Sequence, residues 1–205
     1  MLVSAIIPVL GDEAHLEALR SQLDGDPRVE VIVAAPPPLG RGAQMNAGAR
    51  RATGEWLLFL HADSRLADGW LDALQRAVAH HDLIGGWFRF SLDAGAWQAR
   101  VIERLVDLRV WLFKLPYGDQ GFFVRRDVFA SLGGYREWPL MEDVDFIRRL
   151  RRSGRLVQLP MRLTTSARRW ERDGWFRRST RNLVLVSLYS LGVAPQTLAR
   201  WYSRR

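Results

Sequence analysis

The sequence contains no cysteine and only one lysine, Lys114. Without cysteine the chain has no disulfide scaffold, no thiol nucleophile and no zinc site with sulfur ligands, and it suits a reducing cytoplasm, which is the location we expect. Long apolar runs are also lacking, because the run at 183–193 is too short to span a bilayer. The apolar start at 2–10 has neither the basic flank nor the cleavage site of a signal peptide, so we interpret it as a buried strand.

Acidic residues are scarce in the last third of the chain. Residues 148–205 hold 15 arginines and only two acids, a net charge of +13, whereas the first 147 residues carry −5. Such clustering predicts an anionic partner, namely a diphosphate, a nucleic acid or acidic lipid headgroups. A genome that favours arginine over lysine explains the choice of arginine but not its position.

Strand and helix patterns alternate along the 205 residues, which predicts an α/β sheet with helices on both faces. Strands are predicted over 2–9, 29–35, 55–60, 86–92, 122–125 and around 155–159. Helices are predicted over 12–23, 42–52, 68–79, 96–115, 127–132 and 141–152, with two more after Gly174 that divide near 192–195. We divide the chain into a main domain, 1–170, and a basic helical segment, 171–205.

His61 and Asp63 directly follow the predicted strand 55–60. Ligands of open α/β sheets bind beyond the carboxyl ends of the strands, and at extended spacing these two side chains project to the same side. An aspartate there can hold Mg²⁺ or Mn²⁺, whose other positions are filled by phosphate oxygens and water. The alternative is that Asp63 caps the next helix, and the residues alone do not decide between the two.

Glu142 and Asp143 lie in the first turn of the predicted helix 141–152. A carboxylate at such a place can act as a general base that takes a proton from a hydroxyl. Helical geometry turns the two side chains about 100° apart, so they cannot both do this. Acidic residues at a helix start also stabilise the helix dipole, which is the structural alternative.

Two further segments suit a phosphorylated ligand. The glycine-bearing loop at 40–48 enters a helix, where free backbone N–H groups and Arg41 can bind phosphate, although its spacing matches neither the P-loop nor the dinucleotide fingerprint. Arg169 and Trp170 combine a guanidinium for a diphosphate with an indole that can stack on a sugar or base. The alternative for this second segment is a solvated basic face with one buried tryptophan.

Together these segments resemble the inverting glycosyltransferases of family 2, particularly small bacterial members, over nearly the whole chain. The strand 6–10 with the acidic turn after it is similar to the family's first strand and nucleotide-contacting turn, and 60–64 stands where the family has its D-x-D metal motif. The motifs at 118–121, 133–135 and 142–143, and then Arg169-Trp170, follow the family's order of sugar-site, catalytic-base and Q-x-x-R-W motifs.

The resemblance implies a GT-A fold with a mixed sheet, a nucleotide-diphospho-sugar donor, Mg²⁺ or Mn²⁺, and inverting transfer to an acceptor hydroxyl. It implies Asp143 as catalytic base, with Glu142 beside it, and a metal at Asp63 and His61. Nucleotide or diphosphate contacts are implied for Pro8, Asp12, Arg41, Gln44, Asn46, Ala62 and Arg169. Contacts to the sugar or acceptor are implied for Asp119, Gln120 and Trp170.

The sequence departs from the family pattern at two places. His61 replaces the first aspartate of D-x-D, so Asp63 is the clear metal carboxylate. Only 36–39 separate the predicted strand 29–35 from the Gly40 loop, whereas a parallel crossover takes about a dozen residues or more. One βα unit, with its base-contacting carboxylate, is therefore missing, and we expect a shortened nucleotide half.

Two other functions compete with this interpretation. A nucleotidyltransferase would carry a G-x-G-T-R-like loop after the first strand, which 11–13 do not supply. The second is a transferase-derived binding protein with an impaired donor site, for nucleic acid or a membrane surface.

The basic helices at 174–205 interleave aromatic residues and arginines. Such segments bind anionic headgroups and settle at membrane interfaces. They suit a lipid-linked acceptor held at the inner face of the membrane by peripheral contact, and we expect no nucleic-acid partner. The alternative is that these helices simply cover the sheet.

Overall fold

A computed structural model describes residues 1–9, 15–37 and 40–203. Its described strands form one mixed sheet in the order β2-β1-β3-β6-β5-β7-β4, in which β1 pairs in parallel with β2 and β3, and β6 runs antiparallel to both β3 and β5. The strands are β1 (Val3–Pro8), β2 (Val29–Ala34), β3 (Trp56–Phe59), β4 (Ser64–Leu66), β5 (Leu83–Asp93), β6 (Phe122–Arg125) and β7 (Arg155–Ser166).

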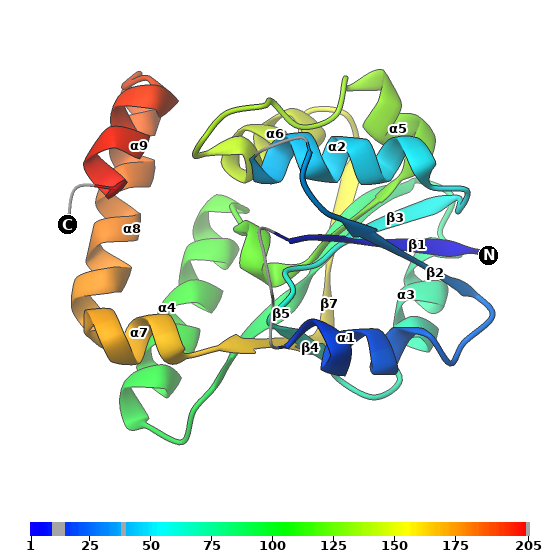
Figure 1. Ribbon diagram of the computed structural model, residues 1–205, viewed down its shortest axis with the longest axis horizontal. Coiled ribbons are helices and arrows are strands. Elements are labelled where there is room, and N and C mark those ends of the chain that lie inside the picture. The colour runs from blue at the N-terminus through cyan, green and yellow to red at the C-terminus, as the bar shows by residue number, and fades with distance from the viewer. Residues whose placement is uncertain (10–14, 38–39, 204–205) are drawn as a thin grey trace.

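Helices cover both faces of this sheet (Figure 1), which confirms the predicted α/β class. They are α1 (Leu16–Leu23), α2 (Arg41–Arg51), α3 (Trp70–Val78), α4 (Trp97–Phe113), α5 (Arg126–Ser131), α6 (Glu142–Leu150), α7 (Arg168–Asp173), α8 (Trp175–Ser190) and α9 (Pro195–Ser203), with a 3₁₀ turn η1 (Gly118–Gln120). One face carries α2, α5 and α6, and the other carries α1 and α3.

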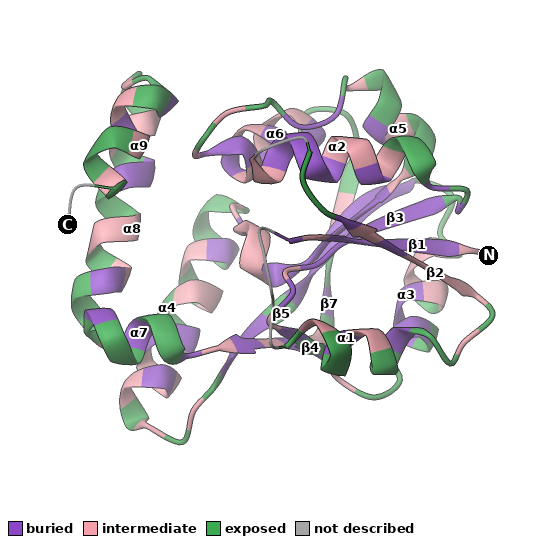
Figure 2. Cartoon of the chain, in the orientation of Figure 1, coloured by how far each residue is buried: buried purple, intermediate pink, exposed green. Residues whose placement is uncertain are grey.

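The central strands are buried because both faces of the sheet are covered (Figure 2). All four residues of β3 are buried, and α6 is fixed against the sheet by Phe146, Ile147 and Leu150, each fully buried. Burial of one such side chain contributes roughly 1.5–3 kcal/mol to the stability of the folded state. The first turn of α6, which carries Glu142, is therefore held in a defined place relative to the sheet.

The connection after β2 is as short as its sequence indicates. Six residues separate β2 from α2, and β2 forms an edge of the described sheet. Helix α2 then packs on β1 and β2 before the chain enters β3 on the other side of β1. Six residues are too few for a further strand and helix between β2 and α2. That the nucleotide half is shortened by this connection stays a prediction.

Three features differ from the sequence prediction. The strand predicted around 155–159 continues to Ser166, and its extension pairs antiparallel with the unpredicted strand β4. The pairing register of β5 with β7 shifts between Phe88 and Arg89. This irregularity interrupts the alternation of side chains in β7 that would have indicated a long strand. Strand β4 and helix α7 are too short, at three and six residues, to show a clear period.

The basic C-terminal segment packs beside the main domain. Helix α8 lies along α4, and a cluster of buried side chains joins α8 and α9 to the start of α6, through Leu185, Val186, Leu198, Met141 and Val144. The segment thus stands at one end of the sheet, near the start of α6. Within the described ranges, no helix has both the length and the apolarity needed to cross a membrane.

Candidate active site

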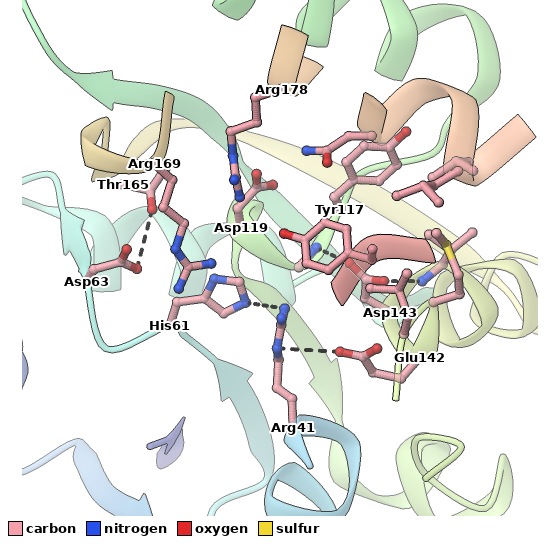
Figure 3. Close-up of a pocket in the computed structure, with 18 of the residues that line it drawn as sticks. Arg41, His61, Asp63, Tyr117, Asp119, Glu142, Asp143, Thr165, Arg169 and Arg178 are labelled. Atoms are coloured by element: carbon pink, nitrogen blue, oxygen red, sulfur yellow. Dashed lines mark hydrogen bonds and ion pairs between the residues drawn. The ribbon is translucent and has the colours of Figure 1, made fainter. Parts of the chain in front are cut away.

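A cavity of about 140 Å³ opens where β3, η1, α6 and the C-terminal helices meet (Figure 3). Eight of the side chains selected from the sequence line it: Arg41, His61, Asp63, Asp119, Glu142, Asp143, Arg169 and Trp170. They come from segments up to 129 positions apart in the sequence, between Arg41 and Trp170. The fold therefore brings the predicted metal, base, diphosphate and sugar positions into one cavity.

Asp143 is held by two backbone N–H groups. Gly118 donates to its Oδ2 at 2.7 Å, and Val144 donates to its Oδ1 at 2.8 Å. A carboxylate has about four lone-pair positions, so each oxygen can still accept a proton or a hydroxyl hydrogen bond. The carboxylate is thus fixed in orientation and remains able to act as a base.

The backbone around Asp143 is specialised on both sides. Met141, which precedes α6, has a φ of 70°, a left-handed conformation that costs energy for a residue with a side chain. At Gly118, a Cβ would lie 3.2 Å from Asp143 Oδ2 and 3.3 Å from His61 Nε2. Gly118 therefore allows η1 to approach the carboxylate closely enough for the hydrogen bond.

Arg41 connects Glu142 to His61. Its Nε lies 3.5 Å from Glu142 Oε1, and its Nη1 lies 3.2 Å from His61 Nε2. Burial raises the pKa of Glu142, and Arg41 opposes this rise. Burial, together with Arg41 and Arg169, holds the pKa of His61 well below 6.5, so this imidazole is neutral at physiological pH. Glu142 and Asp143 contact different groups, as the 100° helical spacing requires.

Asp63 offers the carboxylate that a divalent cation needs. It directly precedes β4, while Gly69 caps the next helix, so the helix-cap alternative is wrong. Its Oδ1 lies 3.4 Å from the Thr165 hydroxyl, a long hydrogen bond that leaves the carboxylate available. No group of three or more His, Asp or Glu side chains in the described chain could hold a metal. A cation at Asp63 would therefore need phosphate oxygens and water as its remaining ligands, and the metal role of Asp63 stays a prediction.

His61 fits a metal less well than Asp63. Its neutral ring has a lone pair to offer, but Arg41 places a positive charge at its Nε2. A second cation at that nitrogen would be repelled unless Arg41 moved. The predicted role of His61 as a ligand stays a prediction, and its observed contact is with Arg41.

A smaller cavity of about 80 Å³ adjoins the first and contains most of the predicted diphosphate site. It is lined by Pro8, Arg41, Gln44, His61, Ala62, Asp63 and Arg169. Gln44 is fully buried; its Nε2 donates to the carbonyl of Val9 at 2.6 Å, and its Oε1 has no partner among the described residues.

Two predicted nucleotide residues are not among these lining side chains. Asp12 lies outside the described residues. Asn46 instead holds the backbone of Tyr135, donating to its carbonyl and accepting from its N–H, both at 2.9 Å. This pair of bonds ties α2 to the loop before α6, and Asn46 has the contacts of a positioning residue. A nucleotide contact by Asn46 stays a prediction.

The predicted sugar positions Asp119 and Gln120 differ in their surroundings. Gln120 is fully buried, where it receives hydrogen bonds from Arg109 and the Tyr117 N–H and donates to Phe88, each at 3.3 Å. Asp119 faces the cavity, and its Oδ1 has no hydrogen-bond partner in the described chain. Burial, reinforced by Asp143, raises the pKa of Asp119 to about 6. Asp119 is thus the side chain free to meet a ligand.

Replacing Asp119 with asparagine is expected to stabilise the protein at pH 7.5. The folded state binds this proton more tightly than the unfolded chain, with a pKa of about 6 against 3.8, so ionisation costs stability as the pH rises through this window. The variant should gain up to about 2–3 kcal/mol at pH 7.5 and almost nothing at pH 4. Urea unfolding of both proteins at the two pH values measures this, and an equal gain at both would contradict it.

Trp170 is mostly enclosed. Its ring packs on Phe90 at 6.1 Å and under the guanidinium of Arg178 at 5.0 Å, and its Nε1 donates to Ser179. Arg178 is in turn buried and bonded to Asp173 at 2.8 Å. Trp170 still lines the cavity, and a contact of this residue with the sugar or acceptor stays a prediction.

Sequence reasoning missed several residues that complete the cavity wall: Tyr117, Thr165, Arg178, Asn182 and Tyr202. Tyr117 directly precedes the 118–121 motif, and that adjacency was the available signal. Thr165 lies two positions after the buried Leu163, so both face the same side of β7. A prediction of the full length of β7 would have indicated this. Asn182 and Tyr202 carry no local signal, because only the packing of α8 and α9 against the main domain brings them to the cavity.

Known proteins share this architecture and sequence pattern. The sequence profile described as Glycosyl transferase family 2 matches residues 11–133, and the chain belongs to this family. That finding confirms the resemblance inferred from the motifs.

Two curated relatives support the assignment. The PGL/p-HBAD biosynthesis glycosyltransferases of Mycobacterium tuberculosis (strain H37Ra) and Mycobacterium bovis (strain BCG) are each 34% identical to it over 109 residues. That match covers 50% of this chain and 40% of each relative, so the chain spans well under two thirds of their length.

Solved structures show the fold. The mannosyltransferase PcManGT from Pyrobaculum calidifontis, solved with GDP-Man and Mn²⁺, superposes with a TM-score of 0.63 at 18% identity, covering 95% of this chain and 66% of that one. S. aureus TarS 1–349, solved with UDP-GlcNAc, superposes with a TM-score of 0.58 at 16% identity, covering 81% of this chain and 58% of that one. The predicted GT-A fold is confirmed.

Proposed function

We propose that this protein transfers a sugar from a nucleotide-diphospho-sugar to an acceptor hydroxyl, with inversion and with help from a divalent metal. The observation that carries the proposal is the shared wall of the two cavities. Arg41, His61, Asp63 and Arg169 line both the cavity that holds Asp143 and the smaller one beside Gln44. A donor with its diphosphate on these side chains would have its sugar within the cavity of Asp143.

Asp143 is the proposed general base. It takes the proton of the acceptor hydroxyl as that oxygen attacks the anomeric carbon, and the bond to the diphosphate breaks on the opposite face. One displacement of this kind inverts the anomer. The N–H groups of Gly118 and Val144 keep the carboxylate in place during the transfer.

The leaving diphosphate carries negative charge that the site must stabilise. Arg41 and Arg169 are the proposed partners, because guanidinium groups bind phosphate oxygens in pairs of hydrogen bonds. A bound Mg²⁺ or Mn²⁺, held by Asp63, would neutralise part of the same charge. Asp119 and Gln120 are proposed to orient the sugar or the acceptor, Asp119 by direct contact and Gln120 by holding η1.

The acceptor we propose is lipid-linked, with the protein in peripheral contact with a membrane through 174–205. Phe176, Leu183, Val184, Leu191 and Trp201 of this segment are exposed beside exposed arginines such as Arg177 and Arg200. Amphipathic surfaces of this composition bind the boundary between headgroups and acyl chains. Nucleic acid is not a proposed partner.

A thermal-shift panel of nucleotide sugars, each with and without Mn²⁺, tests the proposed function. Binding to the native state raises the melting temperature, by an amount that grows with ligand concentration over Kd. At least one donor should raise it further when Mn²⁺ is present. A panel without any shift would favour the alternative of a binding protein with an impaired donor site.

Replacing Asp63 with alanine is expected to remove the Mn²⁺-dependent part of donor binding. The metal loses its clear protein carboxylate, while the fold should stand, because Asp63 lies beyond the end of β3 and makes one long hydrogen bond. Calorimetric titration of the donor with and without Mn²⁺ measures the effect. Asp93→Ala, a change at an exposed carboxylate that pairs with Arg65 of β4, serves as the control. Unchanged Mn²⁺ dependence in the Asp63 variant would refute the metal assignment.

A further inference from the structure

A second cavity, of about 330 Å³, lies between α4 and α8, and we call it the α4–α8 cleft. Its size falls in the range of about 300–1,000 Å³ that is usual for small-molecule sites. Residues of α4 and α8 form most of its lining, and Tyr117, Asp119 and Trp170 contribute from other elements. Phe176 and Leu183 of this lining also belong to the surface proposed for membrane contact.

Apolar side chains dominate the outer part of the cleft and remain in contact with solvent. Leu105, Leu108, Leu112, Phe176 and Leu183 are between 47% and 56% exposed. At one end Trp97 and Phe176 pack together at 6.0 Å, which ties the start of α4 to the start of α8. Contiguous exposed apolar surface of this kind marks a binding site in soluble proteins.

The inner end of the cleft shares a wall with the candidate active site. Tyr117, Asp119, Trp170 and Asn182 line both the cleft and the cavity of Asp143. At this junction the lining changes from apolar to polar, and Asp119 Oδ1 has no hydrogen-bond partner in the described part of the chain. A ligand that fills both spaces must therefore be apolar at one end and carry hydrogen-bonding groups at the other.

We propose that the α4–α8 cleft binds the hydrocarbon chain of an amphiphilic acceptor, whose hydroxyl-bearing head lies at Asp119 and Asp143. The proposal rests on the proposed function for the identity of this head as acceptor. A flexible hydrocarbon chain fits this site because the cleft leads inward from solvent to the place proposed for the reacting hydroxyl. The cleft, rather than α8 and α9 alone, then selects the acceptor, since most of its apolar lining residues belong to α4.

Binding of neutral alkyl glucosides with four to eight chain carbons, below their micelle concentrations and without any donor, tests the cleft. Each methylene that moves from water into an apolar site should tighten binding about fourfold. Calorimetric titration measures the series. An affinity that does not depend on chain length would overturn the proposal.

Two adjacent residues of α8 provide a matched pair of variants. Leu183 lines the cleft and is 56% exposed, whereas Val184 is 49% exposed and does not line it. Leu183→Asp should weaken octyl glucoside binding at least tenfold, and Val184→Asp less than twofold. Both positions are exposed, so both variants should fold, which melting curves check. Equal losses in the two variants would overturn the proposal, because they would indicate general surface adsorption.

Three further outcomes distinguish a failure of the proposed cleft from a failure of the proposed function. Chain-length-dependent binding without any donor-induced thermal shift would support the cleft and refute the transferase. With an active donor, Leu183→Asp should raise the KM for an octyl acceptor at least tenfold and leave kcat within twofold. A dimer in sedimentation experiments that Leu183→Asp, but not Val184→Asp, converts to monomer would overturn the proposal in favour of a second copy in the cleft.

Discussion

Replacing Asp143 with asparagine is expected to lower turnover by roughly 10²–10⁴-fold, the usual contribution of a general base. The amide cannot take the acceptor proton, whereas it is nearly isosteric with the carboxylate. Donor affinity should change little, because Asp143 does not line the smaller diphosphate cavity. Single-turnover rates with saturating donor, together with calorimetric donor affinities, measure the two effects separately.

The Asp143 variant also loses part of a structural contact, so its stability must be measured. Two backbone N–H groups donate to the carboxylate, and the amide can accept only one of these bonds without placing its NH₂ against the other. We expect a loss of about 1–2 kcal/mol in the free energy of unfolding, too little to unfold the protein. Glu142→Gln is the comparison: if it abolishes turnover while Asp143→Asn keeps more than a tenth, the base is Glu142.

Most of the main elements could be predicted from the sequence because their patterns are local. Continuous apolar runs gave β1, β2 and β3 within one or two residues, and the carboxyl end of β3 then predicted where His61 and Asp63 would lie. The turn at Gly192 likewise predicted the division between α8 and α9. In each case one segment of chain contained the whole signal.

Contacts between distant segments could not be predicted in the same way. Nothing near Arg41 indicates that its guanidinium faces Glu142, 101 positions later, or that Asn46 holds the backbone of Tyr135. The α4–α8 cleft has the same origin. The leucines of α4 follow an ordinary helical pattern in the sequence. They form a wall of the cleft only because α8 packs beside α4. Local periodicity fixes which face of a helix is apolar, but not which partner covers it.

The ion pair between Arg41 and Glu142 leads to the second large expected effect. Glu142 is 5% exposed and Arg41 39%, with 3.5 Å between Nε and Oε1. Replacing Arg41 with methionine leaves a buried carboxylate without its cation, so the pKa of Glu142 should rise further. We expect a loss of about 2 kcal/mol at pH 8, less than for a fully buried pair because Arg41 is partly solvated. The loss should shrink as the pH falls and Glu142 takes up a proton.

A double variant separates the structural role of Arg41 from its role toward the donor. In Arg41→Met with Glu142→Gln, the buried charge is gone, so the free energy of unfolding should return to within about 1 kcal/mol of the parent. Donor affinity should stay about tenfold to a hundredfold weaker in both variants, because a charged hydrogen bond to phosphate is missing in each. Urea unfolding and donor titrations on the parent, both single variants and the double variant complete the cycle. Recovery of donor affinity together with stability would show that Arg41 acts only by holding Glu142, and the diphosphate would then depend on Arg169 and the metal.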